Sequence, residues 1–310
     1  MRASWAAFPV AALLCAVSPG QKPAAPAATP EQPSVIKVDV TRNNILFTVT
    51  DKKGRFVTDL NKDDFEIMEN RRPQQILEFA AKSDLPLRLG VLIDTSNSIR
   101  DRFRFEQEAA TEFVNSVLNP HVDKVMVVGF DTTAQLASDL VDDSNKAAHA
   151  IAMLRPGGGT ALFDALYFSC FDKLAVDQPK SDFRRAIVIL SDGDDNQSRY
   201  TAGQALERAI KDEVVIYAVS TNTSHIETDG DKILKRLTEE TGGVAYFPFK
   251  AEDMEQDFAN IANELRHQYN ISYRPEPLAT DGLFHEVQMR VKGRKDLLIR
   301  ARAGYYAQKM

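Results

Sequence analysis

The chain has 310 residues, a length that suggests about two domains and allows a large buried core. Hydrophobic residues make up 44% and charged residues 26% of the sequence, which is ordinary for a globular protein and excludes a wholly disordered chain. The formal net charge of −6 argues against binding to nucleic acid or to anionic lipid, because both need a basic surface, and two cysteines are too few for a disulfide scaffold.

Residues 1–20 have the pattern of a secretory signal peptide. Arg2 is followed by an apolar run from Trp5 to Val17, which ends in small and turn-forming residues. This run is shorter than the about 20 apolar residues of a membrane-spanning helix. We therefore expect an exported protein, periplasmic or secreted, with no membrane span once the segment is cleaved. An uncleaved N-terminal anchor is the alternative. Residues 21–33 are rich in Pro and Ala and predict an extended linker.

Residues 34–84 predict a small antiparallel β segment, because short alternating runs are separated by polar turns. An alternating pattern over Val35–Val40 predicts a first strand, and the run Ile45–Val49 predicts a second. Two further short strands, Phe65–Ile67 and Gln75–Leu77, flank a polar hairpin loop.

Residues 85–268 change to an alternation of strands and helices. Four nearly continuous, β-branched apolar runs are typical of strands buried on both faces: Leu87–Ile93, Lys124–Phe130, Ala186–Leu190 and Val214–Val219. Helical patterns lie between or after them, at Phe103–Val117, Asn145–Leu154, Ala161–Leu174, Thr201–Lys211 and Asp253–His267. The alternation predicts a doubly wound, mainly parallel α/β sheet with helices on both sides.

Two details refine this α/β domain. Thr133–Ala137 follows the preceding strand too closely for a crossover helix, so we expect an antiparallel edge strand there. Cys170 follows Leu166 at helical spacing and is expected to be a buried structural thiol.

Residues 269–308 return to strand periodicity. Strands are predicted at Gln268–Tyr273, Glu286–Val291 and Leu297–Ala301. Neither flank has enough strands to bury a sheet face alone. We therefore expect this segment to pair with residues 34–84 in one small β-sandwich, with the α/β domain inserted between them. Residues 85–268 expressed alone should then fold, whereas the two flanks should not fold separately.

Polar side chains gather where two of the central strands end. Asp94, Ser96 and Ser98 follow the first strand at alternate positions, and Asp192 follows the strand that ends near Leu190. The carboxyl ends of parallel strands meet at one edge of a sheet, where ligands of this fold class bind. A third hydroxyl, that of Thr160, follows a run of glycines and precedes a helix. Carboxylates and hydroxyls suit a hard cation such as Mg²⁺, Mn²⁺ or Ca²⁺ better than zinc.

The ordered set of Asp-x-Ser-x-Ser after the first strand, Thr in a Gly-rich loop, and Asp-Gly after a hydrophobic strand resembles the metal-ion-dependent adhesion site (MIDAS) of von Willebrand factor type A (VWA) domains. The resemblance covers roughly residues 87–268. It implies that Ser96, Ser98 and Thr160 coordinate Mg²⁺ or Mn²⁺, and that Asp94 and Asp192 bind the ion directly or through water. The segments Val49–Gly54, Asp64–Asn70 and Gly304–Ala307 also resemble exported acidobacterial proteins that carry this domain.

The resemblance implies a function as well as a fold. In VWA domains the ion keeps an open coordination position that a carboxylate of a protein ligand fills. We therefore expect a metal-dependent protein-binding module of the cell-adhesion type, not an enzyme, whose partner presents an acidic side chain. In relatives, ligand binding can accompany a shift of the last helix, which is Asp253–His267 here.

Two other interpretations stay open. An aspartate loop after a strand also begins phosphoaspartate chemistry, but that chemistry needs a general acid two residues later, where this chain has Ser96. The sequence has neither a phosphate loop with lysine nor a Gly-x-Ser-x-Gly elbow, and its five histidines lack metal-ligand spacing. The second alternative is a structural module with a degenerate metal site. Asp131, Asp194 and Asp195 are expected to be turn residues or outer partners of the site.

Overall fold

The computed structural model describes residues 42–81, 84–100, 102–222, 224, 226–248, 250 and 253–309. The expected signal peptide, the linker and the strand predicted at Val35–Val40 lie outside the described residues. Among the described residues, no helix has the length and the apolar run needed to cross a membrane.

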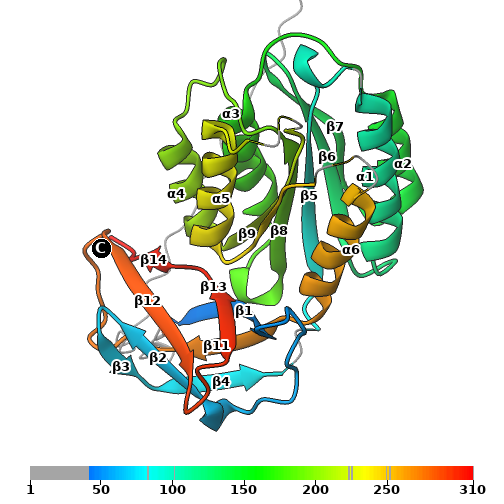
Figure 1. Ribbon diagram of the computed structural model, residues 1–310. Coiled ribbons are helices and arrows are strands. Elements are labelled where there is room, and N and C mark those ends of the chain that lie inside the picture. The colour runs from blue at the N-terminus through cyan, green and yellow to red at the C-terminus, as the bar shows by residue number, and fades with distance from the viewer. Residues whose placement is uncertain are drawn as a thin grey trace, which may run out of the picture. The chain divides into compact units, whose positions relative to one another are not determined.

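A six-stranded sheet with the order β10-β9-β8-β5-β6-β7 forms the centre of the α/β domain (Figure 1). Its strands are β5 (Leu87–Asp94), β6 (Lys124–Phe130), β7 (Ala134–Val141), β8 (Arg184–Ser191), β9 (Val214–Ser220) and β10 (Ala245–Tyr246). All neighbouring pairs are parallel except β6 and β7. The predicted parallel sheet and its antiparallel edge strand are confirmed, and the short strand β10 is an addition to the prediction.

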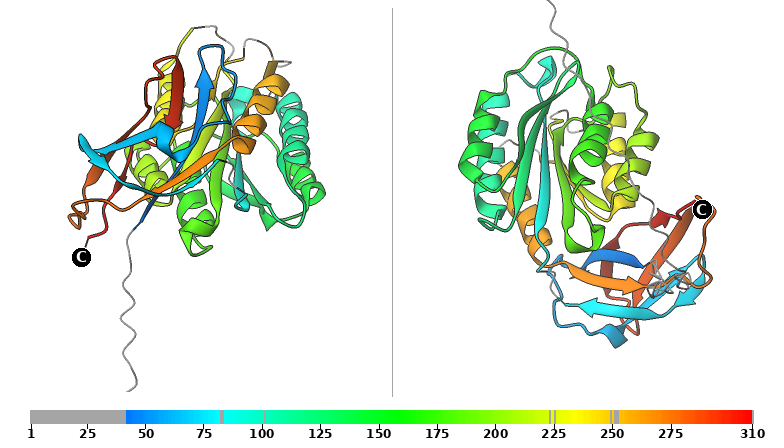
Figure 2. Two further views of the ribbon diagram at one scale, coloured as in Figure 1. Left: turned by 90° about the horizontal axis from the view of Figure 1, so that it is seen from below. Right: turned by 180° about the vertical axis from the view of Figure 1, so that it is seen from behind.

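Helices cover both faces of this sheet (Figure 2). One face packs against α1 (Phe103–Val117), α2 (Ser144–Met153) and α6 (Asp253–Arg266). The other packs against α3 (Leu162–Phe168), the π-helix η3 (Ser169–Leu174), α4 (Ala202–Lys211) and α5 (Asp229–Thr241). The side chains of β5 alternate between these two cores, because successive residues of a strand point to opposite faces.

The predicted helices match the structure with two differences. The helix expected over Ala161–Leu174 is divided into α3 and η3, and α5 was not predicted. Cys170 of η3 is fully buried, as expected. Burial raises the pKa of its thiol well above the usual range, so the thiol stays protonated. Three short 3₁₀ helices lie in the connections among the described residues: η1 (Lys62–Asp64), η2 (Asn97–Ile99) and η4 (Lys180–Asp182).

Strands from the two flanks form two four-stranded antiparallel sheets. The first has the order β13-β1-β11-β4 and contains β13 (Leu297–Ala301), β1 (Asn43–Asp51), β11 (Tyr269–Tyr273) and β4 (Ile76–Ala80). The second has the order β14-β12-β2-β3 and contains β14 (Gly304–Tyr306), β12 (Phe284–Val291), β2 (Phe65–Glu69) and β3 (Arg72–Gln74). The N-terminal strand β1 lies between β11 and β13, and β2 pairs with β12. This pairing confirms the predicted sandwich of N- and C-terminal segments.

A single apolar core lies between the two small sheets. Phe47 of β1 packs edge-to-face on Phe65 of β2, with ring centroids 5.2 Å apart, and stacks on Tyr269 of β11 at 5.3 Å. Such aromatic pairs stabilise a core beyond the area that they bury. The described residues from 42 onward belong to one compact unit, so independent folding of residues 85–268 stays a prediction.

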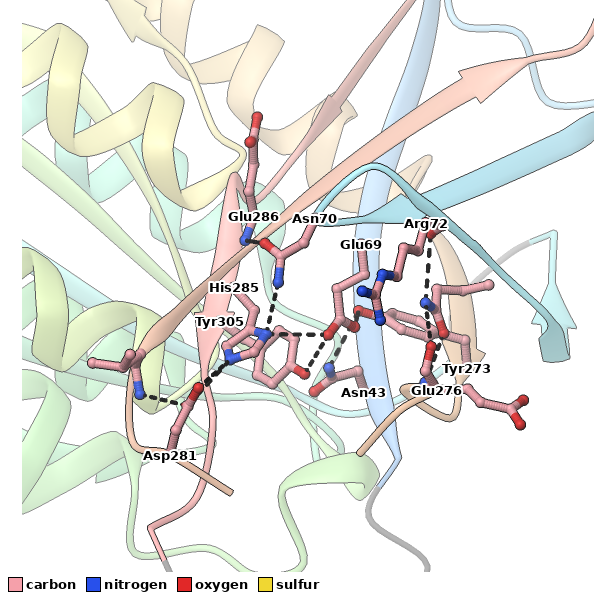
Figure 3. Close-up of polar contacts among 12 residues, drawn as sticks. Asn43, Glu69, Asn70, Arg72, Tyr273, Glu276, Asp281, His285, Glu286 and Tyr305 are labelled. Carbon is pink, nitrogen blue, oxygen red and sulfur yellow. Dashed lines mark hydrogen bonds and ion pairs between the residues drawn. The ribbon is translucent and has the colours of Figure 1, made fainter. Parts of the chain in front are cut away.

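Buried polar contacts also join the two small sheets (Figure 3). The carboxylate of Glu69 accepts hydrogen bonds from the hydroxyls of Tyr273 (2.8 Å) and Tyr305 (3.0 Å). His285 Nδ1 lies 3.3 Å from the same carboxylate and Nε2 contacts Asp281. Burial and the neighbouring Glu69 charge raise the pKa of both tyrosines, so their hydroxyls stay protonated and donate.

Candidate metal site at the edge of the central sheet

The predicted site begins at Asp94, the last residue of β5, whose side chain is fully buried. Its Oδ1 accepts a hydrogen bond from the backbone N–H of Ser96 (2.8 Å), and its Oδ2 accepts one from the hydroxyl of Ser191 (2.8 Å) at the end of β8. Burial raises the pKa of Asp94 to about 6; these hydrogen bonds oppose the shift, and the negative charge of Asp192 adds to it. The carboxylate is therefore held between two adjacent strands.

The two serines of the same loop contact each other. The hydroxyl oxygens of Ser96 and Ser98 lie 2.9 Å apart. Ser96 is buried and Ser98 is exposed, because η2 begins directly after Ser96 and turns the chain toward solvent. The hydroxyl pair thus extends from the buried carboxylate to the protein surface.

The glycine loop is bound to this first loop through the backbone. The N–H of Gly157 donates to the carbonyl of Thr95 (2.6 Å), and the carbonyl of Gly158 accepts from the backbone N–H (3.3 Å) and the side-chain amide (3.2 Å) of Asn97. Gly158 has φ +74°, and a Cβ there would lie 2.5 Å from Thr132 Oγ1. Glycine is therefore required at this position by both backbone conformation and space.

Thr160 connects the glycine loop to the loop after β8. Its carbonyl accepts from the N–H groups of Asn196 and Gln197, both at 3.0 Å, and its own N–H donates to Asn196 Oδ1 (3.1 Å). Asp192 lies on the same loop and is partly exposed; burial raises its pKa. Gly193 fits against the start of α5, since a Cβ there would lie 2.3 Å from the carbonyl oxygen of Gly230.

The five predicted ligands therefore lie at the end of β5, where Asp94 is the last residue, and on three loops that hydrogen-bond one another at the carboxyl ends of β5 and β8. Direct hydrogen bonds join Asp94, Ser96 and Ser98. The negative charge of Asp192 raises the pKa of Asp94. The backbone of Thr160 forms hydrogen bonds with Asn196 and Gln197 of the loop after β8. That the five side chains share one ion stays a prediction.

The neighbouring aspartates have local roles. Asp195 Oδ2 accepts from the N–H of Phe163 (3.0 Å) in the first turn of α3 and from the hydroxyl of Ser198 (2.6 Å). Asp131 Oδ1 accepts from the N–H of Thr133 (3.1 Å), which closes the turn between β6 and β7. Asp194 is exposed. Asp131 is thus a turn former, as expected, whereas Asp195 caps a helix, a role that was not expected for it.

Comparison with known proteins identifies the type of domain. Residues 89–194, which contain all five predicted ligands, match the family model of the von Willebrand factor type A domain. Among solved structures, the chain is similar to a von Willebrand factor type A protein from Catenulispora acidiphila, at 15% identity and a TM-score of 0.52, over 79% of this chain and 73% of that one. The α/β domain has the VWA fold.

A second similar protein is the proximal thread matrix protein 1 of the mussel byssus. One structure of it matches at 16% identity and a TM-score of 0.51, over 63% of this chain and 50% of that chain. Another structure of it, described as having a zinc-occupied MIDAS motif, matches at 18% identity and a TM-score of 0.50. This match covers 64% of this chain and 49% of the mussel protein's chain. This chain therefore spans about half of the mussel protein. The comparison with curated proteins found no match.

The donor set of the VWA domain fits a hard divalent cation. Two carboxylates with raised pKa values, Asp94 and Asp192, lie in one another's field, and a divalent ion would relieve their repulsion. The described residues contain no group of three or more His, Cys, Asp or Glu placed to hold a metal. The candidate set is instead two carboxylates with three hydroxyls, which differs from the His- and Cys-rich composition of structural zinc sites.

The sequence analysis missed one acidic residue of this region, Glu106 of α1. Its side chain is fully buried, and burial raises its pKa to about 8; the charge of Arg102 opposes that shift, and the charges of Asp94 and Asp192 add to it. The signal was present in the sequence, because Glu106 falls on the apolar stripe of α1, three residues after Phe103 and four before Ala110.

Proposed function

We propose that the protein is an exported, non-enzymatic module that binds Mg²⁺ or Mn²⁺ and, through the ion, an acidic side chain of a partner protein. The observation that carries this proposal is the buried Asp94 carboxylate beside the contacting hydroxyls of Ser96 and Ser98, in the field of Asp192. Thr160 supplies the fifth oxygen.

The charge balance of these residues explains why the site would favour an acidic partner. Ser96, Ser98 and Thr160 are neutral, so only two carboxylates offset the charge of the ion. When bound, the ion supplies an electrophilic position that a carboxylate from another protein can occupy. Exposed Ser98 and partly exposed Asp192 place the site where a partner can reach it.

Calorimetric titration with Mn²⁺ tests the metal site. Wild-type protein should take up one ion per chain, and Asp94→Ala should take up none while its circular dichroism spectrum is retained. Glu112→Ala is the matched control, because this exposed acid of α1 lies outside the predicted ligand set. Uptake that survives Asp94→Ala would show that the ion lies elsewhere. A titration with Zn²⁺ tests the preference, since zinc occupies the motif of the mussel protein.

Pull-down from the envelope of the source organism tests the adhesive role. Partner proteins should be captured with Mn²⁺ present and released by EDTA, and Asp94→Ala should capture none of them. Capture that is unchanged by EDTA and by Asp94→Ala would support instead a structural module with a degenerate metal site.

The phosphoesterase alternative makes a different prediction. The position of the general acid is held by Ser96, so the proton donor that phosphoaspartate chemistry needs is missing. We expect no turnover of p-nitrophenyl phosphate with Mg²⁺. Turnover that disappears in Asp94→Ala would replace our proposal with an enzymatic function.

Export rests on the N-terminal sequence. Mass spectrometry of the protein recovered from the periplasm and the medium should find a chain that begins near residue 21. An intact N-terminus in the membrane fraction would support the uncleaved anchor.

A further inference from the structure

A groove of about 530 Å³ lies between the edge strand β7 and the helix α2, next to the candidate metal site. The two elements are neighbours at one edge of the central sheet (Figure 1). Its volume is within the usual range of ligand pockets. We call it the β7–α2 groove. Its lining includes Thr95, Asp131, Leu136, Lys146, Met153 and Arg155.

Backbone and side-chain contacts join this groove to two loops of the candidate metal site. Thr95, which lies between Asp94 and Ser96, accepts a hydrogen bond at its carbonyl from the N–H of Gly157 in the glycine loop (2.6 Å). Asp131 packs against the same loop, since a Cβ on Gly158 would lie 3.3 Å from Asp131 Cγ. The groove and the candidate metal site therefore share a wall.

Exposed apolar side chains line the groove from two different elements. Met153 of α2 is 59% exposed and Leu136 of β7 is 37% exposed. Single exposed apolar residues are common on protein surfaces. Two that line one groove beside a binding site offer an apolar side chain of a partner a place to be buried.

The permanent charges of the groove are mainly positive. Lys146 and Arg155 are both exposed, and Asp131 is the one permanent acid among the lining residues. The nearest carboxylate to Lys146 is that of Asp143, at 3.9 Å and largely in solvent, so this ion pair is weak. Arg155 Nη1 donates to two backbone carbonyls at the end of α2, which fixes the guanidinium. In a chain with a net charge of −6, this local excess of positive charge favours an acidic partner.

We propose that the β7–α2 groove binds the partner segment that supplies the carboxylate to the ion, and that it selects segments with an apolar side chain and a second acidic side chain close to that carboxylate. This inference rests on the proposed function and names the chemistry of its partner. The apolar side chain packs against Met153 and Leu136, and the second acid lies beside Lys146 and Arg155. One extended segment can reach both places, because it advances about 3.3 Å per residue and the groove adjoins the site.

Fluorescence anisotropy with defined peptides in the presence of Mn²⁺ tests this selection. The parent peptide is a heptapeptide with Asp at the centre of a Gly/Ser background, and each other position is replaced in turn by Leu, Glu or Lys. Wild type should bind the best Leu peptide about tenfold more tightly than the parent. The best Glu peptide should bind about threefold more tightly, since exposed ion pairs contribute little, and no Lys peptide should gain.

Substitutions in the groove should change these preferences separately. Met153→Glu should remove the preference for Leu, and Arg155→Glu should reverse the preference from Glu to Lys. Lys146→Glu should give the same reversal without loss of the contacts that Arg155 makes at the end of α2. Val176→Glu is the matched control, because this residue is 67% exposed and lies outside the groove. All four variants should take up Mn²⁺, since none removes a predicted ligand, and thermal denaturation checks their folding.

The outcomes separate this inference from the proposed function. Mn²⁺ uptake by wild type without any preference for the Leu or Glu peptides would overturn the role of the groove and leave the cation site in place. Preferences that persist unchanged in Met153→Glu, Arg155→Glu and Lys146→Glu would also overturn it. If wild type took up no Mn²⁺, the proposed function would fail. A Leu preference without the ion that Met153→Glu removes would then still support the groove, and its absence would overturn both.

Discussion

Three buried or half-buried acids on the VWA domain differ in what compensates them. Asp94 has hydrogen bonds from Ser96 and Ser191, Asp192 has one from the backbone of Asp194, and Glu106 has none among the described residues. The burial of Glu106 without a partner raises its pKa further above the ordinary value than that of Asp94. The difference has a direct consequence for stability.

The free energy of unfolding should fall as pH rises from 6.5 to 8 in cation-free buffer. Glu106 has a pKa of about 8 in the folded protein and about 4.3 when unfolded, so the folded state binds more protons in this window. The slope contributed is at most about 1.4 kcal/mol per pH unit. Urea denaturation should show the fall in wild type and in Glu112→Gln, and a flatter profile in Glu106→Gln. An equal slope in Glu106→Gln would show that another group titrates.

The adjacent glycines Gly157 and Gly158 of the glycine loop allow a second prediction about single residues. Gly158→Ala should destabilise the protein by about 1–3 kcal/mol and weaken Mn²⁺ binding, because φ is +74° and the new Cβ would meet Thr132 Oγ1 at 2.5 Å. Gly157→Ala is the matched control, since a Cβ there has open space. Thermal denaturation and Mn²⁺ titration measure the two effects. Equal effects of both variants would show that the backbone of Gly158 is not restrictive.

At the scale of single elements, the start of α3 depends on a side chain that is distant in sequence. Ala161, the residue before α3, makes no capping hydrogen bond with its side chain, and Asp195 from the loop after β8 accepts from Phe163 N–H instead. Capping from another loop joins the helix to the loops of the candidate metal site. Since Thr160 lies two residues before the first residue of α3, we expect the same contact to help position its hydroxyl.

Asp195→Ala should therefore lower stability by about 1–2 kcal/mol, the usual effect of removing a helix cap. It should also weaken Mn²⁺ binding, because the loop of Thr160 loses one of its anchors. Glu112→Ala, which removes an exposed acid of α1, should leave both unchanged. Chemical denaturation and Mn²⁺ titration are the measurements. A full loss of stability without any change in Mn²⁺ affinity would show that the cap does not position Thr160.

At the scale of the whole molecule, the VWA domain and the sandwich are joined by a buried acid of the last helix. Glu264 of α6 is 2% exposed and contacts Arg300 of β13 and Thr48 of β1. Burial raises the pKa of Glu264, and the charge of Arg300 opposes the shift. The contact explains why residues 85–268 alone should fold with lower stability than the full chain, since that fragment lacks both partners of Glu264.

The stability of the two small sheets should depend on the buried hydrogen bonds that Tyr273 and Tyr305 donate to the carboxylate of Glu69. These three residues are the Glu69 cluster. Tyr273→Phe removes a hydrogen bond to a buried carboxylate and should lower stability by about 1–3 kcal/mol. Tyr306→Phe, on the short strand β14, is the control for loss of a tyrosine hydroxyl outside the cluster. Thermal denaturation compares the two. If both variants matched wild type, the apolar core alone would hold the sheets together.

Much of the fold and the candidate site could be predicted from local sequence. The apolar runs of β5, β6, β8 and β9 and the helical periodicity of α1 locate these elements, because periodicity reports which face of an element is buried. The order of Asp94, Ser96, Ser98, Thr160 and Asp192 along these elements identified the VWA domain that the family model matches. The helix α5 was missed although its sequence carries a capping box at Thr228 and Asp231.

What the sequence determined by itself is the type and order of the elements and the chemistry at their ends. Only the tertiary structure decided that β1 lies between β11 and β13, that Asp195 caps α3, and that Glu106 is buried without a partner in the field of Asp94. The physical reason is that hydrophobic periodicity shows which side chains of an element are buried, but not which other segment packs against them. Desolvation and charge at a side chain depend on segments far away in the sequence that the fold brings next to it.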